Sequence, residues 1–140
     1  MKEIHKDRIP DELLNTATRL HGHLGPFLVV GIRMTLLAER ILRAKPTSCQ
    51  AMVTKKRPLY CAIDGIKAVM GENTVAIKEG TGLVAEFSCD EKKKVTLRPI
   101  ISLLEKYIDT PWELCEEYAR EVMFNYDNYE LFEEIGRGKF

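Results

Sequence analysis

Two histidines separated by one residue, His21 and His23, have the types and spacing that most directly suggest chemistry. In an α-helix this spacing turns the two side chains about 200° apart, so they would not share a ligand. Gly22 and Gly25 favour an irregular segment, in which both rings can face one point. His23 also precedes an apolar helix, whose positive N-terminal end disfavours an imidazolium. A neutral imidazole suits metal ligation or hydrogen-bond donation, although two satisfied histidines at a helix junction give the same pattern.

Cys61 is the third residue of interest, because it lies where a strand is predicted to pass into a short helix. A thiol at a helix N-terminus has a lowered pKa, and a thiolate can be a metal ligand or a nucleophile. His21, His23 and Cys61 with an open fourth position would make a zinc site, provided that the fold brings them together. Asp64, in the first turn after Cys61, is either a carboxylate that orients a ligating histidine or an acid at a helix start.

Arg33 is the one charged residue in the apolar first half of a helix predicted over residues 26–44. A lone arginine on a buried helix usually pairs with a carboxylate or a helix end. The alternative is that Arg33 faces the site. Arg33 and Asp64 are therefore the candidates for residues that orient the metal ligands without binding the metal themselves.

The elements that must position these residues follow from hydrophobic periodicity and turn signals. A start signal at 110–113 opens one of the helices and predicts that Trp112 and Cys115 face inward. Hairpin turns are predicted at 79–82 and 90–93. Helices are predicted over 11–20, 26–44, 62–70, 99–107, 110–124 and 129–135, and strands over 49–54, 58–61, 74–78, 83–88 and 94–98. This order predicts an α+β fold: a mostly antiparallel sheet of about four or five strands packed against a long buried N-terminal helix, with C-terminal helices.

The composition argues against several classes of protein. A length of 140 residues suits one domain, and 21 Lys and Arg balance 21 Asp and Glu, which leaves no positive footprint for nucleic acid. The charged residues 1–10 predict no signal peptide, and the longest uncharged apolar run, 24–32, is shorter than the ~20 residues that span a membrane. We therefore expect a cytoplasmic protein without nucleic-acid or membrane partners. The four cysteines have no Cys-x-x-Cys spacing, which argues against a zinc finger.

These motifs carry a family resemblance. The run His-Gly-His-Leu-Gly-Pro at 21–26, followed by Gly-Ile-Arg at 31–33, resembles the N-terminal signature of the E subunit of formylmethanofuran dehydrogenase, which is His-Gly-His-x-Cys-Pro-Gly and then Gly-x-Arg. Residues 61–66 resemble its second signature, and 80–87 its glycine- and phenylalanine-containing hairpin. The resemblance covers roughly residues 12–107. It implies an α+β core, often dimeric, with a His/Cys cleft that can hold a metal such as zinc.

The chain departs from that family pattern in three ways. The cysteine of the first signature is Gly25 here, and the segment 71–74 lacks a further cysteine. The cysteine-rich zinc finger that many members carry at the C-terminus is replaced by predicted helices. We therefore expect a core domain at 1–107 and a helical extension at 108–140 packed on the same domain.

The resulting hypothesis is a metal-binding protein with His21, His23 and Cys61 as ligands of zinc or another divalent transition metal. Its role would be that of an accessory subunit or a small one-carbon or redox-related enzyme, with Cys61 and His23 as catalytic residues. Expected partners are a second copy, in a homodimer, and a larger oxidoreductase complex. Two alternatives remain open: a non-catalytic interaction module with a degenerate site, and a metal-free enzyme in which Cys61 is the nucleophile and His23 the base.

Overall fold

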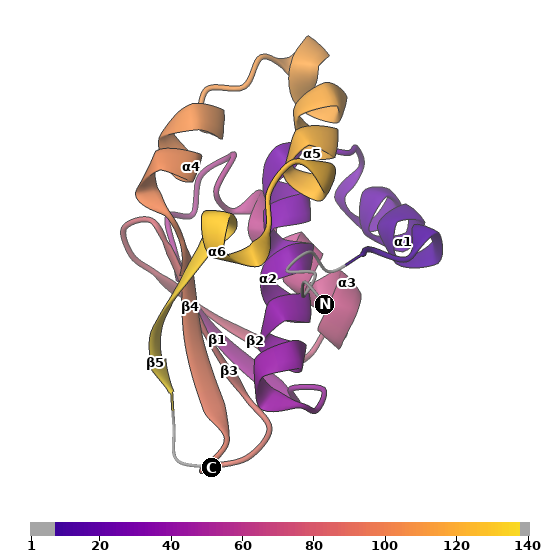
Figure 1. Cartoon of the computed structure of the whole chain (residues 1–140). Coiled ribbons are helices and arrows are strands. Elements are labelled where there is room, and N and C mark those ends of the chain that lie inside the picture. The colour runs from indigo at the N-terminus through magenta and orange to yellow at the C-terminus, as the bar shows by residue number, and fades with distance from the viewer. Residues whose placement is uncertain (1–7, 138–140) are drawn as a thin grey trace, which may run out of the picture.

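The computed structural model describes residues 8–137, which form a five-stranded mixed sheet with helices packed on one of its faces (Figure 1). The α+β class is thus confirmed. Most of the charged start, for which the sequence predicts no signal peptide, lies outside the described residues. The helices are α1 (Asp11–His21), α2 (Pro26–Leu42), α3 (Cys61–Met70), α4 (Ile101–Tyr107), η1 (Trp112–Leu114), α5 (Cys115–Phe124) and α6 (Asn128–Leu131). The strands are β1 (Ser48–Val53), β2 (Val75–Glu79), β3 (Leu83–Ser88), β4 (Lys94–Pro99) and β5 (Phe132–Arg137).

The strands lie in the order β2-β1-β3-β4-β5. β1 and β2 are parallel and the other pairings are antiparallel, so the sheet is mixed. The parallel pair arises because α3 crosses over between β1 and β2 and returns the chain in the same direction. Two local expectations are therefore wrong. Residues 58–60 are turns that lead into α3 at Cys61 rather than a strand, and 79–82 closes no hairpin, because β3 pairs with β1 and β4.

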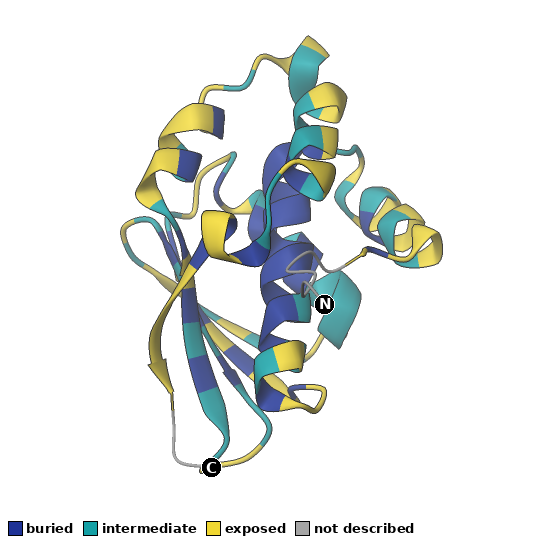
Figure 2. Ribbon diagram, in the orientation of Figure 1, coloured by how far each residue is buried: buried dark blue, intermediate teal, exposed yellow. Residues whose placement is uncertain are grey.

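The buried helix of this fold is α2, the second helix rather than the N-terminal one. Thirteen of its 17 residues are buried, and Figure 2 shows it as a mostly dark blue column at the centre of the molecule. Its first half is apolar nearly all round, so other elements pack on it from several sides. α1, in contrast, buries only Ala17. The expected long helix over 26–44 is a helix of 17 residues that ends at Leu42.

Two glycines let α2 and α3 approach closely. A Cβ atom added to Gly31 would lie 2.0 Å from the carbonyl oxygen of Ala62, and one added to Gly65 would lie 2.3 Å from that of Leu28. No side chain larger than hydrogen fits at either distance, so the two backbones touch directly. This contact fixes the first turn of α3, and with it Cys61, against the middle of α2.

The C-terminal segment corrects another expectation, the helix over 129–135. α6 has only four residues and begins at a capping box, in which Asp127 and Glu130 accept each other's backbone N–H at 2.9 Å. The chain then extends as β5 along β4, and Arg98 on β4 pairs with Glu133 on β5 at 3.0 Å. Cross-strand pairing therefore outweighs the local helical pattern here.

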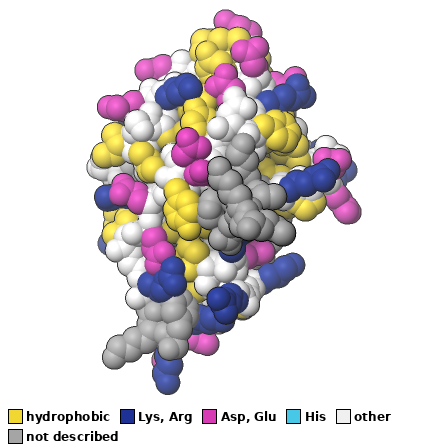
Figure 3. All heavy atoms as spheres, in the orientation of Figure 1, with side chains coloured by type: hydrophobic (Ala, Val, Ile, Leu, Met, Phe, Trp, Pro, Cys, Tyr) yellow, Lys and Arg dark blue, Asp and Glu magenta, His cyan; other side chains and the backbone are white. Residues whose placement is uncertain are grey.

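Charges of both signs are interspersed over the molecular face shown in Figure 3. This mixture agrees with the equal totals of 21 basic and 21 acidic residues. Within residues 8–137, no helix combines the length and the apolar character that crossing a membrane requires.

Candidate functional site

The centre of the candidate site is a histidine–carboxylate pair, in which the histidine is buried and the carboxylate is half-exposed. His21 is the last residue of α1, where Gly22 ends the helix with a left-handed φ of 104° and donates its N–H to the carbonyl of Thr18 at 2.8 Å. The His21 side chain is only 5% exposed, and its Nδ1 lies 2.7 Å from Oδ2 of Asp64, in the first turn of α3. Its other ring nitrogen, Nε2, is also buried and has no hydrogen-bond partner among the described residues.

This geometry assigns distinct roles to the two ring nitrogens of His21. A carboxylate accepts hydrogen bonds, so we assign the ring proton to Nδ1, which donates it to Asp64. Nε2 then carries a lone pair that accepts no hydrogen bond from any described residue. A buried polar atom normally has a partner, and a bare imidazole lone pair backed by a carboxylate can bind a metal ion or accept a proton.

His23 lies beside this pair, in the short segment between α1 and α2. Its ring centroid is 4.8 Å from that of His21 and 4.5 Å from that of Trp112. Gly25 lies next to the ring, since a Cβ there would be 3.4 Å from His23 Nε2, an ordinary contact. Burial lowers the pKa of His23 below its ordinary 6.5, and the electrostatic influence of the neighbouring His21 ring and of the Arg57 guanidinium lowers it further. His23 is therefore mostly neutral at pH 7, and the causes are burial and its neighbours rather than the helix end considered in the sequence.

Cys61 is the first residue of α3, one helical turn before Asp64, and its side chain is half-buried. The sequence predicts a lowered thiol pKa at this helix start, and that prediction is wrong for the isolated thiol. Burial raises the pKa of Cys61 above 9.0; the charge of Arg57 opposes the rise, while Asp64 and Cys115 add to it. Desolvation of the thiolate therefore outweighs the helix end.

These residues come from three segments that meet: the end of α1, the entrance to α2 and the start of α3. The fold brings His21 into contact with both His23 and Asp64. It does not gather a complete ligand set, since residues 8–137 contain no group of three or more His, Cys, Asp or Glu side chains arranged to hold one metal ion.

Arg33 serves a different purpose from the one predicted at the site. Its guanidinium is fully buried and donates to the carbonyl oxygens of Val122 and Tyr126, at 2.8 and 2.7 Å, and to Oδ1 of Asn128 at 3.0 Å. The role of supporting the ligands is therefore corrected: Arg33 pairs with a helix end and ties α2 to the end of α5.

Three residues near the site were missed by sequence reasoning. Trp112 was expected to face inward, yet it is 69% exposed and packs against His23. Cys115, three residues later, contributes to the raised pKa of Cys61. Arg57 ends a basic run four positions before Cys61, and the charge of that run near the start of α3 was the available signal. The sequence predicts the helix start that carries Trp112 and Cys115. It does not predict which elements these two side chains face, because that depends on tertiary packing.

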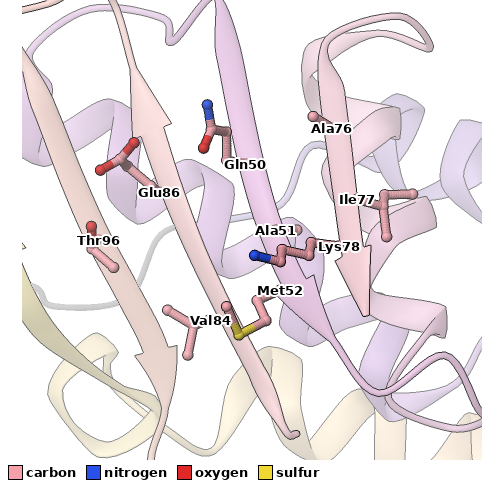
Figure 4. Close-up of a pocket in the computed structure, with 9 residues that line it drawn as sticks. All are labelled: Gln50, Ala51, Met52, Ala76, Ile77, Lys78, Val84, Glu86 and Thr96. Carbon is pink, nitrogen blue, oxygen red and sulfur yellow. The ribbon is translucent and has the colours of Figure 1, made fainter. Parts of the chain in front are cut away.

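A separate hollow of about 290 Å³ lies on the outer face of the sheet, which the helices leave uncovered (Figure 4). Its lining includes Gln50, Met52, Lys78 and Glu86, and the described residues around it include no histidine or cysteine. The hollow follows from the pleat of an open sheet face, and we do not assign it to the site.

Comparison with known proteins gives this arrangement a context. No curated protein matches the chain. Residues 20–123 match the FmdE family, described as the molybdenum formylmethanofuran dehydrogenase operon family. The matched span contains the histidine pair, Cys61, Asp64 and Trp112, and it covers well over half of the 140 residues. The chain therefore belongs to the FmdE family.

Proposed function

We propose that this protein is an accessory component of a formylmethanofuran dehydrogenase type of enzyme, and that its histidine site binds a divalent transition metal, with zinc as the first candidate. The family's description, which names the operon of the molybdenum enzyme, supports the accessory role. The donor types at the site support the metal, because imidazole and thiolate are the ligands that zinc prefers.

The single observation that carries the metal proposal is the state of His21. Its Nδ1 is 2.7 Å from Asp64, and its buried Nε2 has no partner in the described part of the chain. Ligating histidines almost always present one nitrogen to the metal and donate the other N–H to a carboxylate or carbonyl group. An apolar contact would have served the fold equally well here without leaving a buried nitrogen unsatisfied.

His21 would be the first ligand, and His23 and Cys61 are the proposed further donors. The neutral state of His23 fits that role, because only a neutral imidazole can ligate. The raised pKa of Cys61 is compatible with it as well, since a bound cation draws the proton from a thiol that burial would otherwise keep protonated. When bound, the metal would supply a Lewis acid with an open coordination position.

Metal analysis of the purified protein tests this proposal. We expect close to one equivalent of zinc or a similar ion, and a loss of most of it in His21→Ala and in Cys61→Ser. Cys89→Ser is the matched control, because Cys89 directly follows β3 and its thiol donates to the carbonyl of Lys45 at 3.6 Å. Circular dichroism establishes that the variants fold. Less than a tenth of an equivalent, unchanged by either variant, would overturn the metal proposal.

The same result separates the two alternatives. A metal-free protein whose Cys61 is alkylated faster than Cys89 at neutral pH would be a thiol enzyme with Cys61 as nucleophile and His23 as base. A metal-free protein with uniform alkylation rates would be an interaction module.

The proposed assembly includes a homodimer and a cytoplasmic location beside the larger enzyme, with residues 1–107 as core domain and 108–140 as extension. Sedimentation equilibrium is the direct test of the first point. We expect twice the chain mass of 16.0 kDa, and a mass of one chain at all concentrations would refute the dimer.

A further inference from the structure

The outer face of the sheet is covered by no described helix, although part of that face belongs to a parallel pair of strands. β1 and β2 are parallel, and α3, which connects them, lies on the opposite face together with the buried helix α2 (Figure 1). Parallel strands are usually covered on both faces, whereas antiparallel strands commonly leave one face to water. The outer face over β1 and β2 is therefore the part of this sheet for which a cover is expected.

Apolar side chains contribute to this open face. Alternation along the strands places Met52 of β1, Ala76 of β2 and Val84 of β3 on the outer side, and Met52 is 43% exposed. All three line the hollow shown in Figure 4. Methionine is enriched at the centres of protein interfaces, and a hollow beside it can receive a side chain from a partner. These residues therefore suit contact with another protein surface.

Two opposite charges lie on this face, on either side of β1. In the register of the sheet, Lys78 on β2 is beside Met52, and Glu86 on β3 is beside Gln50. Both line the hollow (Figure 4), and neither has an ion pair with another residue between 8 and 137. A two-fold axis in the plane of contact, crossing β1 between Gln50 and Met52, exchanges the two positions. The face is therefore complementary in charge to a second copy of itself.

The size of the face is sufficient for such a contact. Strands lie about 4.8 Å apart and rise about 3.3 Å per residue, so five strands of five or six residues make a face roughly 24 Å wide and roughly 20 Å long. Two copies packed face to face would together bury roughly 1,000 Å², which is about the area that a biological interface needs.

We infer that two copies of this chain associate through the outer faces of their sheets, with Lys78 of each copy paired to Glu86 of the other. The inference rests on the homodimer of the proposed function and deepens it by naming the interface. His21 and its partner Asp64 lie on α1 and α3, on the helical side of the sheet. Both histidine sites therefore stay open in this dimer.

Charge reversal tests the pairing, with sedimentation equilibrium of the whole chain giving the dissociation constant of the dimer. Lys78→Glu and Glu86→Lys each place like charges opposite one another, so each should weaken the dimer by at least about tenfold. The double variant restores opposite charges and should recover most of the parental affinity. Arg19→Glu reverses an exposed charge on α1 and is the control, which should leave the dissociation constant unchanged.

The outcomes separate the interface from the dimer itself. A dimer that both single reversals leave at parental strength, or a double variant no stronger than the single ones, would overturn the inference and leave the homodimer standing. The mass of one chain at all concentrations would overturn both, without bearing on the metal. Circular dichroism establishes that each variant folds. Lys78→Gln and Glu86→Gln replace any reversal that does not fold, and each should weaken the dimer by a few fold.

Discussion

Nδ1 of His21 and Oδ2 of Asp64 lie 2.7 Å apart, although the two residues are 43 positions apart in the chain. The contact joins the last residue of α1 to the first turn of α3. It fixes the tautomer of a ring whose other nitrogen is buried and bare. A junction between two helices requires neither this contact nor a buried nitrogen without a partner, so the arrangement indicates a functional site.

Replacing Asp64 by Asn should weaken metal binding by about 10- to 100-fold, because carboxylates behind a ligating histidine contribute that much to affinity. The shape of the side chain is kept and its charge is lost. Zinc affinity is measured by competition with a coloured chelator. Asp109→Asn, at an exposed position outside the site, is the control. Equal affinities in the two variants would show that the His21–Asp64 contact is structural only.

A cysteine at position 25, where the family signature has one, should increase the affinity of the site for zinc. Gly25 has an extended backbone, with φ at −141°, and a Cβ there would lie 3.4 Å from Nε2 of His23, an ordinary contact. Gly25→Cys therefore adds a sulfur next to His23 without strain. Structural zinc sites share roughly 10–16 kcal/mol among four ligands, so one more ligand should raise zinc affinity by at least about tenfold.

Gly25→Ser is the matched control, since it has the same size and lacks the soft ligand. The competition assay should rank Gly25→Cys above both Gly25→Ser and the parent. A cysteine variant that binds zinc no better than the serine variant would contradict the placement of the metal beside His23.

The lowered pKa of His23 predicts how stability depends on pH. Above 6.5, the ordinary value, the ring is neutral in both the folded and the unfolded chain, and its contribution is constant. Below 6.5 His23 is protonated in the unfolded chain but remains neutral in the folded chain. The free energy of unfolding therefore falls as the pH falls, until the pKa of His23 in the folded chain is reached. Urea unfolding of metal-free protein, repeated at stepped pH, measures this slope.

His23→Gln should flatten that part of the profile, since it removes the titrating group. Arg57→Gln should move the pKa of His23 upward, which NMR titration of the imidazole can follow, because the Arg57 charge is one cause of the lowering. An unchanged His23 titration in Arg57→Gln would place Arg57 away from the histidines.

The sequence predicts the histidine end of the site well, because its signals are local. Gly22 and Gly25 mark an irregular segment, and the apolar run after Pro26 predicts the buried helix that follows. Cys61 at the start of α3 is read from the same kind of signal. The helix boundaries around the site therefore depend on few distant contacts.

What the sequence did not predict depends on long-range packing. The pattern around Asp64 fits a helix-start acid and a partner of His21 equally well, and only the fold selects between them. Thr110 opens the helix start predicted at 110–113. Its hydroxyl instead donates to the carbonyl of Tyr107 at 2.7 Å, and Trp112 is exposed. Residues 132–137 are a strand because β4 is available to pair with them.

Removing the Arg33 guanidinium should destabilise the fold. Arg33→Met keeps the length and apolar stem of the side chain but leaves three buried or half-buried oxygens without their donor, those of Val122, Tyr126 and Asn128. We expect a loss of about 3 kcal/mol in the free energy of unfolding, measured with urea. Arg19→Met, at an exposed position on α1, should change it by less than about 0.5 kcal/mol. Similar losses in both variants would contradict the role of Arg33 as the tie between α2 and α5.

The close approach of α2 and α3 gives the sharpest test of the fold that holds the site. Gly31→Ala would place a methyl group 2.0 Å from the carbonyl oxygen of Ala62, and because the Cβ is fixed rigidly to one backbone and the oxygen belongs to the other, the helices must separate. Overpacking of this kind should lower the free energy of unfolding by about 3 kcal/mol. Gly136→Ala is the control, since a Cβ there meets no described atom within 4 Å.

The same substitution should also reach the site, because α3 carries Cys61 and Asp64. At temperatures where Gly31→Ala remains folded, its zinc affinity should fall, while that of Gly136→Ala stays at the parental level. If Gly31→Ala loses stability and keeps its zinc affinity, then the position of α3 against α2 does not set the His21–Asp64 contact. In that case α1 and α3 must hold that pair between themselves.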